Sequence, residues 1–323
     1  MPVLASVIAA IVPMSLYMIL LWRLDKYEKE PFWQVFKHFL WGAIGAVILA
    51  LIFSNVFASS IEILFPSIIV IGLFETVIIA PVVEEFTKGV FLIRSSKSNH
   101  FDNITDGLVY GGAIGLGFGM TENFLYFFTY GVDFESWIFL VIIRSIFSAV
   151  MHCIATATFG AFLAMYKFNI SDVKFLLPVS GYFLAVLIHF MWNLSVSFEE
   201  TYLLGLLFIL LMIALFFFVF AMSLANEKKI IARELGNEKE ISLISPEHIE
   251  ILSTLKRNKK GWIKEEFRKV YIKNAIEYAF RKHQLKYSEE SSKDFYQKEI
   301  DKLKIALTDI VHKIRIDFGE ELK

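Results

Sequence analysis

Seven long apolar runs occupy the first 224 residues of the chain and restrict its fold more than any other feature. An α-helix rises about 1.5 Å per residue, so about 20 apolar residues cross the hydrocarbon core of a bilayer. The composition agrees with a membrane protein, since 56% of the residues are hydrophobic. We therefore predict transmembrane helices at roughly 3–22, 38–58, 74–94, 107–130, 138–166, 176–197 and 202–224.

Charged residues divide the chain into two parts. Residues 1–224 contain ten Lys and Arg residues, whereas residues 225–323 contain twenty-two, together with eighteen acidic residues. Apolar residues recur at helical spacing within this charged tail. The sequence thus predicts an all-α polytopic membrane protein, with about seven transmembrane helices in 1–224 and a small helical cytoplasmic domain in 225–323. This domain could bind a cytoplasmic protein partner or simply cap the membrane part.

Basic residues between the predicted helices indicate the orientation of the chain. The connections after the first, third, fifth and seventh helices contain Lys or Arg, whereas the other three contain neither. Because cytoplasmic loops carry an excess of these residues, we predict a plasma-membrane protein with its N-terminus outside and its C-terminus in the cytoplasm. The stretch 59–73, with Glu62 and Pro66, is predicted to be an outer connection that lies partly in the interface.

Polar residues inside the predicted helices are the main functional signal. A charged side chain near the centre of a bilayer costs about 2.5–3.5 kcal/mol on insertion scales, so such residues usually face the interior of a helix bundle. Four successive helices of this chain contain them, together with two asparagines: Glu84, Glu85, Lys88, Glu122, Asn123, Arg144, His152, His189 and Asn193.

Helix geometry predicts that these residues converge. The rise per residue places Glu84, Glu122, His152 and His189 at nearly one depth. Positions four apart share a helix face, so the polar line that contains Arg144 and His152 also includes Ser148 and Thr156. Glycines four residues apart in the fourth helix form a stripe that allows a neighbouring backbone to approach closely: Gly107, Gly111, Gly115 and Gly119.

Two kinds of acid–base chemistry suit this set of side chains. An ionised Glu84 or Glu85 could activate a water molecule, while His152, His189 and Asn193 stabilise a developing oxyanion. Alternatively, two histidines and a glutamate could hold Zn²⁺, with a second glutamate as general base. The candidate metal ligands are Glu85, Glu122, His152 and His189.

Four further residues are predicted to support the site, namely Lys88, Asn123, Arg144 and Tyr126. Lys88 could neutralise one of the paired glutamates or extend its ammonium toward the membrane surface. Arg144 could pair with Glu75 or bind a lipid headgroup. The asparagines could also form hydrogen bonds between helices.

Four motifs, in this order along the chain, resemble those of the PrsW-type intramembrane proteases. These are EEFTK (84–88), FGMTENFLY (118–126), RSIFSAVMHCIAT (144–156) and HFMWN (189–193). The resemblance covers residues 1–224 and implies a multi-pass membrane peptidase that cleaves membrane-anchored proteins, such as anti-sigma factors in stress signalling. Carried over by motif, it implies that Glu84 and Glu85 are catalytic, with Glu122, His152 and His189 around them.

The wider superfamily includes the CAAX prenyl endopeptidases, which typically show EExxxR and FxxxH motifs. Here Lys88 is the third residue after Glu85, and Glu122 stands in place of the histidine. This departure favours the PrsW-like branch of the superfamily and argues against a prenylated substrate.

Three other function classes compete with a protease. A proton- or ion-coupled transporter is the main alternative, because buried Glu and His residues also form relays, although no inverted repeat is evident. A non-catalytic scaffold would have no need of so many ionisable groups at one depth. The net charge of −1 and the lack of a basic motif argue against nucleic-acid binding. The single cysteine, Cys153, excludes an internal disulfide and a cysteine-based metal site.

Overall fold

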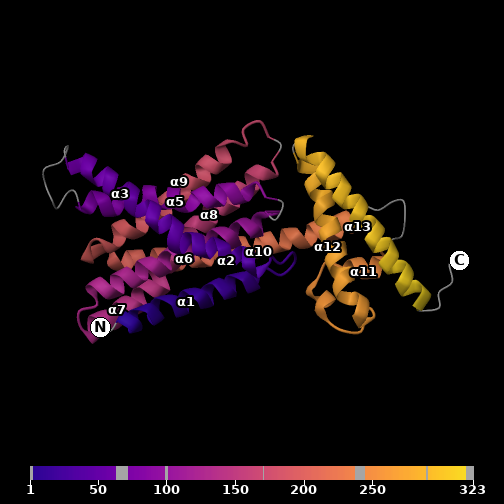
Figure 1. Cartoon of the computed structure of the whole chain (residues 1–323), viewed down its shortest axis with the longest axis horizontal. Coiled ribbons are helices and arrows are strands. Elements are labelled where there is room, and N and C mark those ends of the chain that lie inside the picture. The colour runs from indigo at the N-terminus through magenta and orange to yellow at the C-terminus, as the bar shows by residue number, and fades with distance from the viewer. Residues whose placement is uncertain are drawn as a thin grey trace. The chain divides into compact units, whose positions relative to one another are not determined.

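The structure is a computed structural model that describes residues 3–62, 72–98, 101–169, 171–236, 244–288 and 290–317 (Figure 1). All regular secondary structure in these ranges is helical, which confirms the predicted all-α class. The chain forms two compact units. Unit 1 comprises Met1–Asp25, Glu30–Lys167 and Ser171–Phe220, and unit 2 comprises Lys26–Lys29, Phe168–Ile170 and Ala221–Lys323.

Unit 1 is a bundle of long apolar helices (Figure 1). Each of the predicted transmembrane segments coincides with a helical stretch. The α-helices that contribute to this unit are α1 (Val3–Leu24), α2 (Phe32–Leu40), α3 (Val47–Glu62), α5 (Ala80–Ser96), α6 (Ile104–Tyr130), α7 (Phe134–Ile143), α8 (Ala149–Lys167), α9 (Leu176–Val196) and the first part of α10 (Tyr202–Gly236). A short 3₁₀ segment, η4 (Glu199–Thr201), precedes α10.

Five helical stretches are long and apolar enough to cross a membrane. They are Val3–Leu24, Phe32–Phe57, Phe134–Lys167, Leu176–Val196 and Glu199–Gly236. The predicted spans 74–94 and 107–130 are helical but are not among them, since the first contains three central charges and the second is rich in glycine. The chain is therefore a multi-pass membrane protein, and the count of seven spans stays a prediction. Residues 63–71 of the predicted outer connection lie outside the described residues.

The glycine stripe of α6 packs directly against the backbone of α8. A Cβ atom on Gly107 would lie 2.3 Å from the Gly160 carbonyl oxygen, and one on Gly115 would lie 2.1 Å from the His152 carbonyl oxygen. No side chain fits in these gaps, so the two backbones approach as closely as the stripe predicts. This contact fixes the position of His152, which α8 carries, relative to α6.

Within the described residues of unit 1, three π-helical segments interrupt the bundle, and two of them adjoin the candidate site. They are η1 (Trp41–Ala46), η2 (Glu75–Ile79) and η3 (Arg144–Ser148). Pro81 lies at the start of α5, directly after η2, where its missing N–H removes a donor from the backbone ladder. The backbone just before α5 is therefore a π-helical turn, a feature that is frequent at functional sites.

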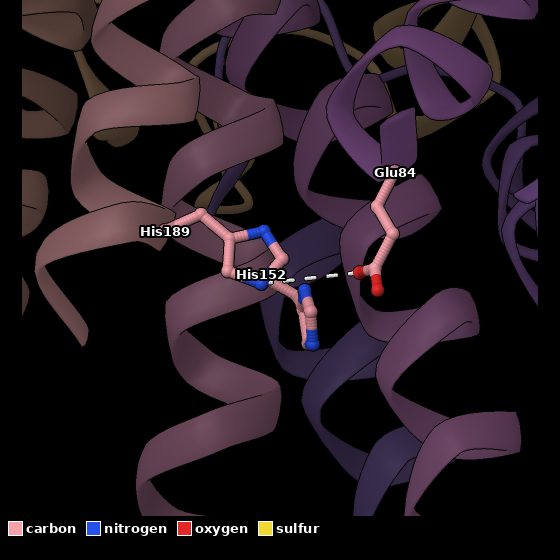
Figure 2. A group of neighbouring side chains, drawn as sticks. All are labelled: Glu84, His152 and His189. Carbon is pink, nitrogen blue, oxygen red and sulfur yellow. Dashed lines mark ion pairs between the residues drawn. The ribbon is translucent and has the colours of Figure 1, made fainter. Parts of the chain in front are cut away.

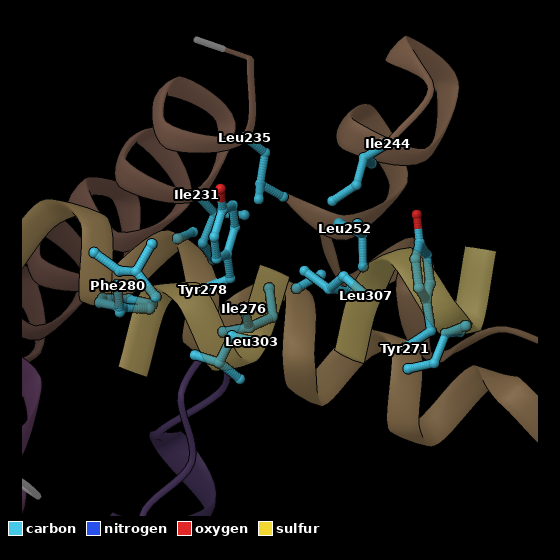
Figure 3. Close-up of a cluster of buried hydrophobic side chains, with 14 of the residues drawn as sticks. Ile231, Leu235, Ile244, Leu252, Tyr271, Ile276, Tyr278, Phe280, Leu303 and Leu307 are labelled. Carbon is cyan, nitrogen blue, oxygen red and sulfur yellow. The ribbon is translucent and has the colours of Figure 1, made fainter. Parts of the chain in front are cut away.

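Unit 2 has a conventional apolar core. Its main elements are the last part of α10, α11 (Pro246–Leu252), the 3₁₀ segment η5 (Leu255–Asn258), α12 (Glu265–Tyr287) and α13 (Glu290–Asp317). Figure 3 shows side chains from these helices meeting in one cluster, including Ile231, Tyr278 and Leu307. The tail is thus helical, as its apolar spacing predicts.

Candidate active site

Four helices bring the predicted acids and imidazoles together inside unit 1. Glu84 and Glu85 lie on α5, Glu122 on α6, His152 on α8 and His189 on α9. The imidazole rings of the two histidines meet edge to face, with their centroids 4.7 Å apart. Figure 2 shows both rings and the Glu84 carboxylate pointing toward one another from separate helices. The convergence expected from helix geometry is therefore present in the fold.

Glu85 is fully buried, and both of its oxygens accept hydrogen bonds. The Lys88 ammonium lies 2.7 Å from Oε1, and His189 Nδ1 lies 3.0 Å from the same oxygen. The Thr156 hydroxyl donates to Oε2 over 2.9 Å. Glu85 therefore holds its neighbours in place, and both of its oxygens are already engaged. Thr156 was not among the predicted site residues, although it lies one turn after His152 on the predicted polar line.

His152 is also buried, and both of its ring nitrogens have partners. Nδ1 lies 2.8 Å from the Lys88 ammonium, and Nε2 lies 2.6 Å from Glu122 Oε2. Because an ammonium can only donate, Nδ1 must accept, and the neutral ring then carries its proton on Nε2 and donates it to Glu122. Lys88 and Glu122 together fix the tautomer and the orientation of this ring.

Glu84 makes fewer hydrogen bonds than the adjacent Glu85. Its Oε2 atom is buried and makes no hydrogen bond. This atom lies 3.9 Å from His189 Nε2 and 3.7 Å from the Lys88 ammonium, both beyond hydrogen-bond distance. The adjacent glutamates thus differ in role as well as in direction, since Glu85 is fully bonded and Glu84 presents an unsatisfied oxygen to the histidines.

Arg144 completes the site at the side of α6. Its guanidinium lies 2.9 Å from Glu122 Oε2, and its Nε donates to Asn123 Oδ1 over 3.1 Å. The same group lies over the Tyr126 ring, 3.5 Å from the ring centroid. Arg144 therefore pairs with Glu122, where the sequence suggested Glu75 or a lipid headgroup. All four supporting residues, Lys88 included, contact the site or one another.

The sequence predicts that Asn193 stabilises an oxyanion, but its side chain bonds to the backbone of η2. Its side-chain amide donates to the Thr76 carbonyl over 2.8 Å, within η2. In a π-helical register this carbonyl would accept from the residue five positions on, which is Pro81 and has no N–H. Tyr182, on the same helix as Asn193, donates to the Val82 carbonyl over 2.8 Å. Helix α9 thus satisfies and positions the irregular start of α5.

The donor atoms fit a metal ion. Glu84, His152 and His189 each offer one ligand atom, and these atoms all lie within 4.8 Å of one another. Imidazole nitrogen and carboxylate oxygen are preferred zinc ligands. Each histidine also contacts a carboxylate through its other nitrogen, Glu85 for His189 and Glu122 for His152, which is the usual second partner of a metal-binding histidine. The buried, unsatisfied Glu84 oxygen favours Glu84 as a ligand over Glu85, whose oxygens are occupied.

Comparisons with known proteins identify related sequences. Residues 30–222 match the family described as "PrsW family intramembrane metalloprotease". A protein named Protease PrsW from Clostridioides difficile is 31% identical over 166 residues, which cover 50% of this chain and 65% of the relative. Its namesake from Oceanobacillus iheyensis is 29% identical over 165 residues, covering 51% of this chain and 70% of the relative. The chain thus spans about two thirds of the length of these relatives. No solved structure matches the chain.

Proposed function

Because the chain belongs to the PrsW family of intramembrane metalloproteases, we propose that it is an intramembrane endopeptidase that hydrolyses peptide bonds of membrane-anchored proteins. The observation that carries this proposal is the buried Glu84 Oε2 atom, which makes no hydrogen bond and faces the two histidines. A buried polar atom without a partner costs free energy, so its retention at this position favours a functional ligand or reactant.

We assign Glu84, His152 and His189 as the residues that would hold the metal, for which Zn²⁺ suits the donor set. A bound zinc ion supplies Lewis-acid activation of water and of a peptide carbonyl. Glu85 would orient His189 through its bond to Nδ1, and Lys88 and Thr156 would hold Glu85 in turn. These residues act by positioning the ligands.

Glu122 is the best candidate for the general base. Its side chain is 23% exposed, against 15% for Glu84 and 1% for Glu85, so it is the least enclosed of the three carboxylates. The described residues engage only its Oε2 atom, through His152 and Arg144. The other carboxylate oxygen can accept a proton from the attacking water and return it to the leaving amine. Arg144 would hold Glu122 in place through its ion pair.

The substrate class follows from the location of the site among apolar helices. A site that lies among membrane-crossing helices suits a peptide segment that is itself anchored in the bilayer. A membrane-anchored anti-sigma factor is one such protein, and the family resemblance suggests it as a substrate. We also propose the plasma membrane as the location, with the N-terminus outside, from the distribution of Lys and Arg in the connections.

The test uses purified full-length protein in liposomes with a single-pass membrane protein as substrate. We expect Glu84→Gln to lose both bound metal and cleavage, whereas Glu122→Gln should keep the metal and lose cleavage. Glu75→Gln is the matched control, since it changes a glutamate of η2 outside the site and should behave as wild type. Cleavage at the wild-type rate by both site variants would exclude the assignment. Ion flux across the same liposomes without cleavage would instead favour the transporter.

A further inference from the structure

The Lys88 ammonium is enclosed at the centre of the site. Lys88 has no exposed surface, and its ammonium lies 2.7 Å from Glu85 Oε1 and 2.8 Å from His152 Nδ1. It is 3.7 Å from Glu84 Oε2, and the face of the Phe118 ring covers it at 4.1 Å from the centroid. A buried ammonium is stable only where acceptors surround it. Lys88 therefore occupies a position that the protein has built to hold a cation.

The atoms around Lys88 overlap with the proposed metal ligands. Glu85 is hydrogen-bonded to Nδ1 of His189, and Glu122 is hydrogen-bonded to Nε2 of His152. The ring atoms that remain for a metal are therefore His189 Nε2 and His152 Nδ1. His152 Nδ1 already accepts from Lys88. Since this nitrogen has one lone pair, it can bind the ammonium or a metal ion but not both.

We propose that Lys88 is an internal cation that competes with the metal for His152 and thereby sets the metal affinity of the site. The inference rests on the proposed metal-dependent function. Without metal, the ammonium satisfies His152 and Glu85 and partly neutralises Glu84, so the donors stay assembled. When metal binds, the ammonium withdraws from His152 Nδ1 and keeps its shorter contact with Glu85 Oε1. One hydrogen bond is exchanged, and the helices need not move apart.

This arrangement has a consequence for metal loading. A divalent ion that binds Glu84, His152 and His189 meets the positive charge of Lys88 nearby, and the two cations repel each other. The site should therefore bind metal more weakly than its three ligands and their carboxylate partners would allow. Lys88 is in this account a positioning residue, which acts on the reaction through the metal.

The test measures metal affinity directly in full-length protein, stripped with a chelator and kept in detergent. Co²⁺ is the probe, because its visible absorption reports both occupancy and the donor set. We expect Lys88→Met to bind Co²⁺ about 10- to 100-fold more tightly than wild type, the range over which partners of metal ligands change affinity. Lys167→Met is the matched control. It removes a lysine of unit 1 that donates to the Ser98 and Phe101 carbonyls, far in sequence from the ligands, and should not change the affinity.

A second variant controls for misfolding of Lys88→Met. Lys88→Met leaves the Glu85 carboxylate buried without its cation, whereas Glu85→Gln with Lys88→Met removes both charges and keeps an oxygen to accept from His189. This double variant should also bind Co²⁺ more tightly than Glu85→Gln alone. Equal or weaker Co²⁺ binding by both Lys88 variants would overturn the role of Lys88. If wild-type protein meanwhile cleaves substrate in a metal-dependent manner, the proposed function stands while this inference fails.

Discussion

The two units distribute polar and apolar side chains in opposite ways. In unit 1 large apolar side chains are exposed, such as Leu203 at 66% and Leu211 at 63%, while Glu85 and Lys88 are buried. In unit 2 a cluster of apolar side chains is buried, as Figure 3 shows, and charged residues form exposed pairs such as Lys313 with Asp309. Apolar exposure costs nothing in lipid, whereas charge burial is expensive in either solvent. Glu85 and Lys88, which are buried at the candidate site, therefore indicate function in unit 1, whereas the apolar cluster of unit 2 stabilises its fold.

The largest expected difference between the units concerns a glycine at a helix contact in unit 1 and an uncrowded glycine in unit 2. Gly115→Ala places a Cβ atom 2.1 Å from the His152 carbonyl oxygen, so α6 and α8 must separate. We expect cleavage to fall about 100-fold, since a displacement of about 1 Å in an active site has this effect. Gly236→Ala in unit 2 is the control, because its Cβ would meet no atom within 4 Å. The assay is substrate cleavage in liposomes, and equal rates for the two variants would contradict the close packing.

Removal of an ion pair should likewise reduce cleavage more in unit 1 than in unit 2. Arg144→Met removes the partner of Glu122 and Asn123, and cleavage should fall about 10-fold because the proposed base loses its orientation. Lys313→Met removes an exposed pair on α13, which contributes at most about 1 kcal/mol to stability. Cleavage by Lys313→Met should match wild type. If the two substitutions lowered cleavage equally, the ion pairs of unit 1 would have no special role.

The smallest effect on cleavage is expected from the core of unit 2. Leu307 is fully buried, and Leu307→Ala should destabilise this unit by about 2–5 kcal/mol. Hydrogen exchange of peptides from α12 and α13 should report faster opening. Cleavage should remain near the wild-type rate, because every described residue of the site lies in unit 1. A large loss of cleavage would mean that unit 2 takes part in the function.

Much of this organisation is predictable from the sequence. The apolar runs determine where the helices lie, and the spacing of Gly107 to Gly119 determines how α6 meets α8. The predicted common depth of Glu84, Glu122, His152 and His189 rests on the helix rise and on the centre of each apolar run, neither of which depends on neighbouring helices. These features follow from local geometry and from the cost of burying charge.

The contacts inside the site were harder to predict, because they depend on how each helix is rotated against its neighbours. Spacing of four residues pairs Lys88 with Glu84, but its short contact is with Glu85, three residues away. The partner of Arg144 is Glu122, on the preceding helix, whereas the sequence suggested Glu75 or a lipid headgroup. The bond from Asn193 to Thr76 depends on a π-helical turn, for which the only local signal is Pro81.

The most direct test of the proposed metal site is the metal dependence of cleavage by the wild-type protein. Protein dialysed against a chelator would be assayed on a membrane-anchored substrate before and after addition of stoichiometric Zn²⁺. We expect cleavage to disappear with the metal and to return with Zn²⁺ in wild type, but not in His189→Ala. Full cleavage by protein that elemental analysis shows to be free of metal would contradict the assignment of Glu84, His152 and His189 as metal ligands.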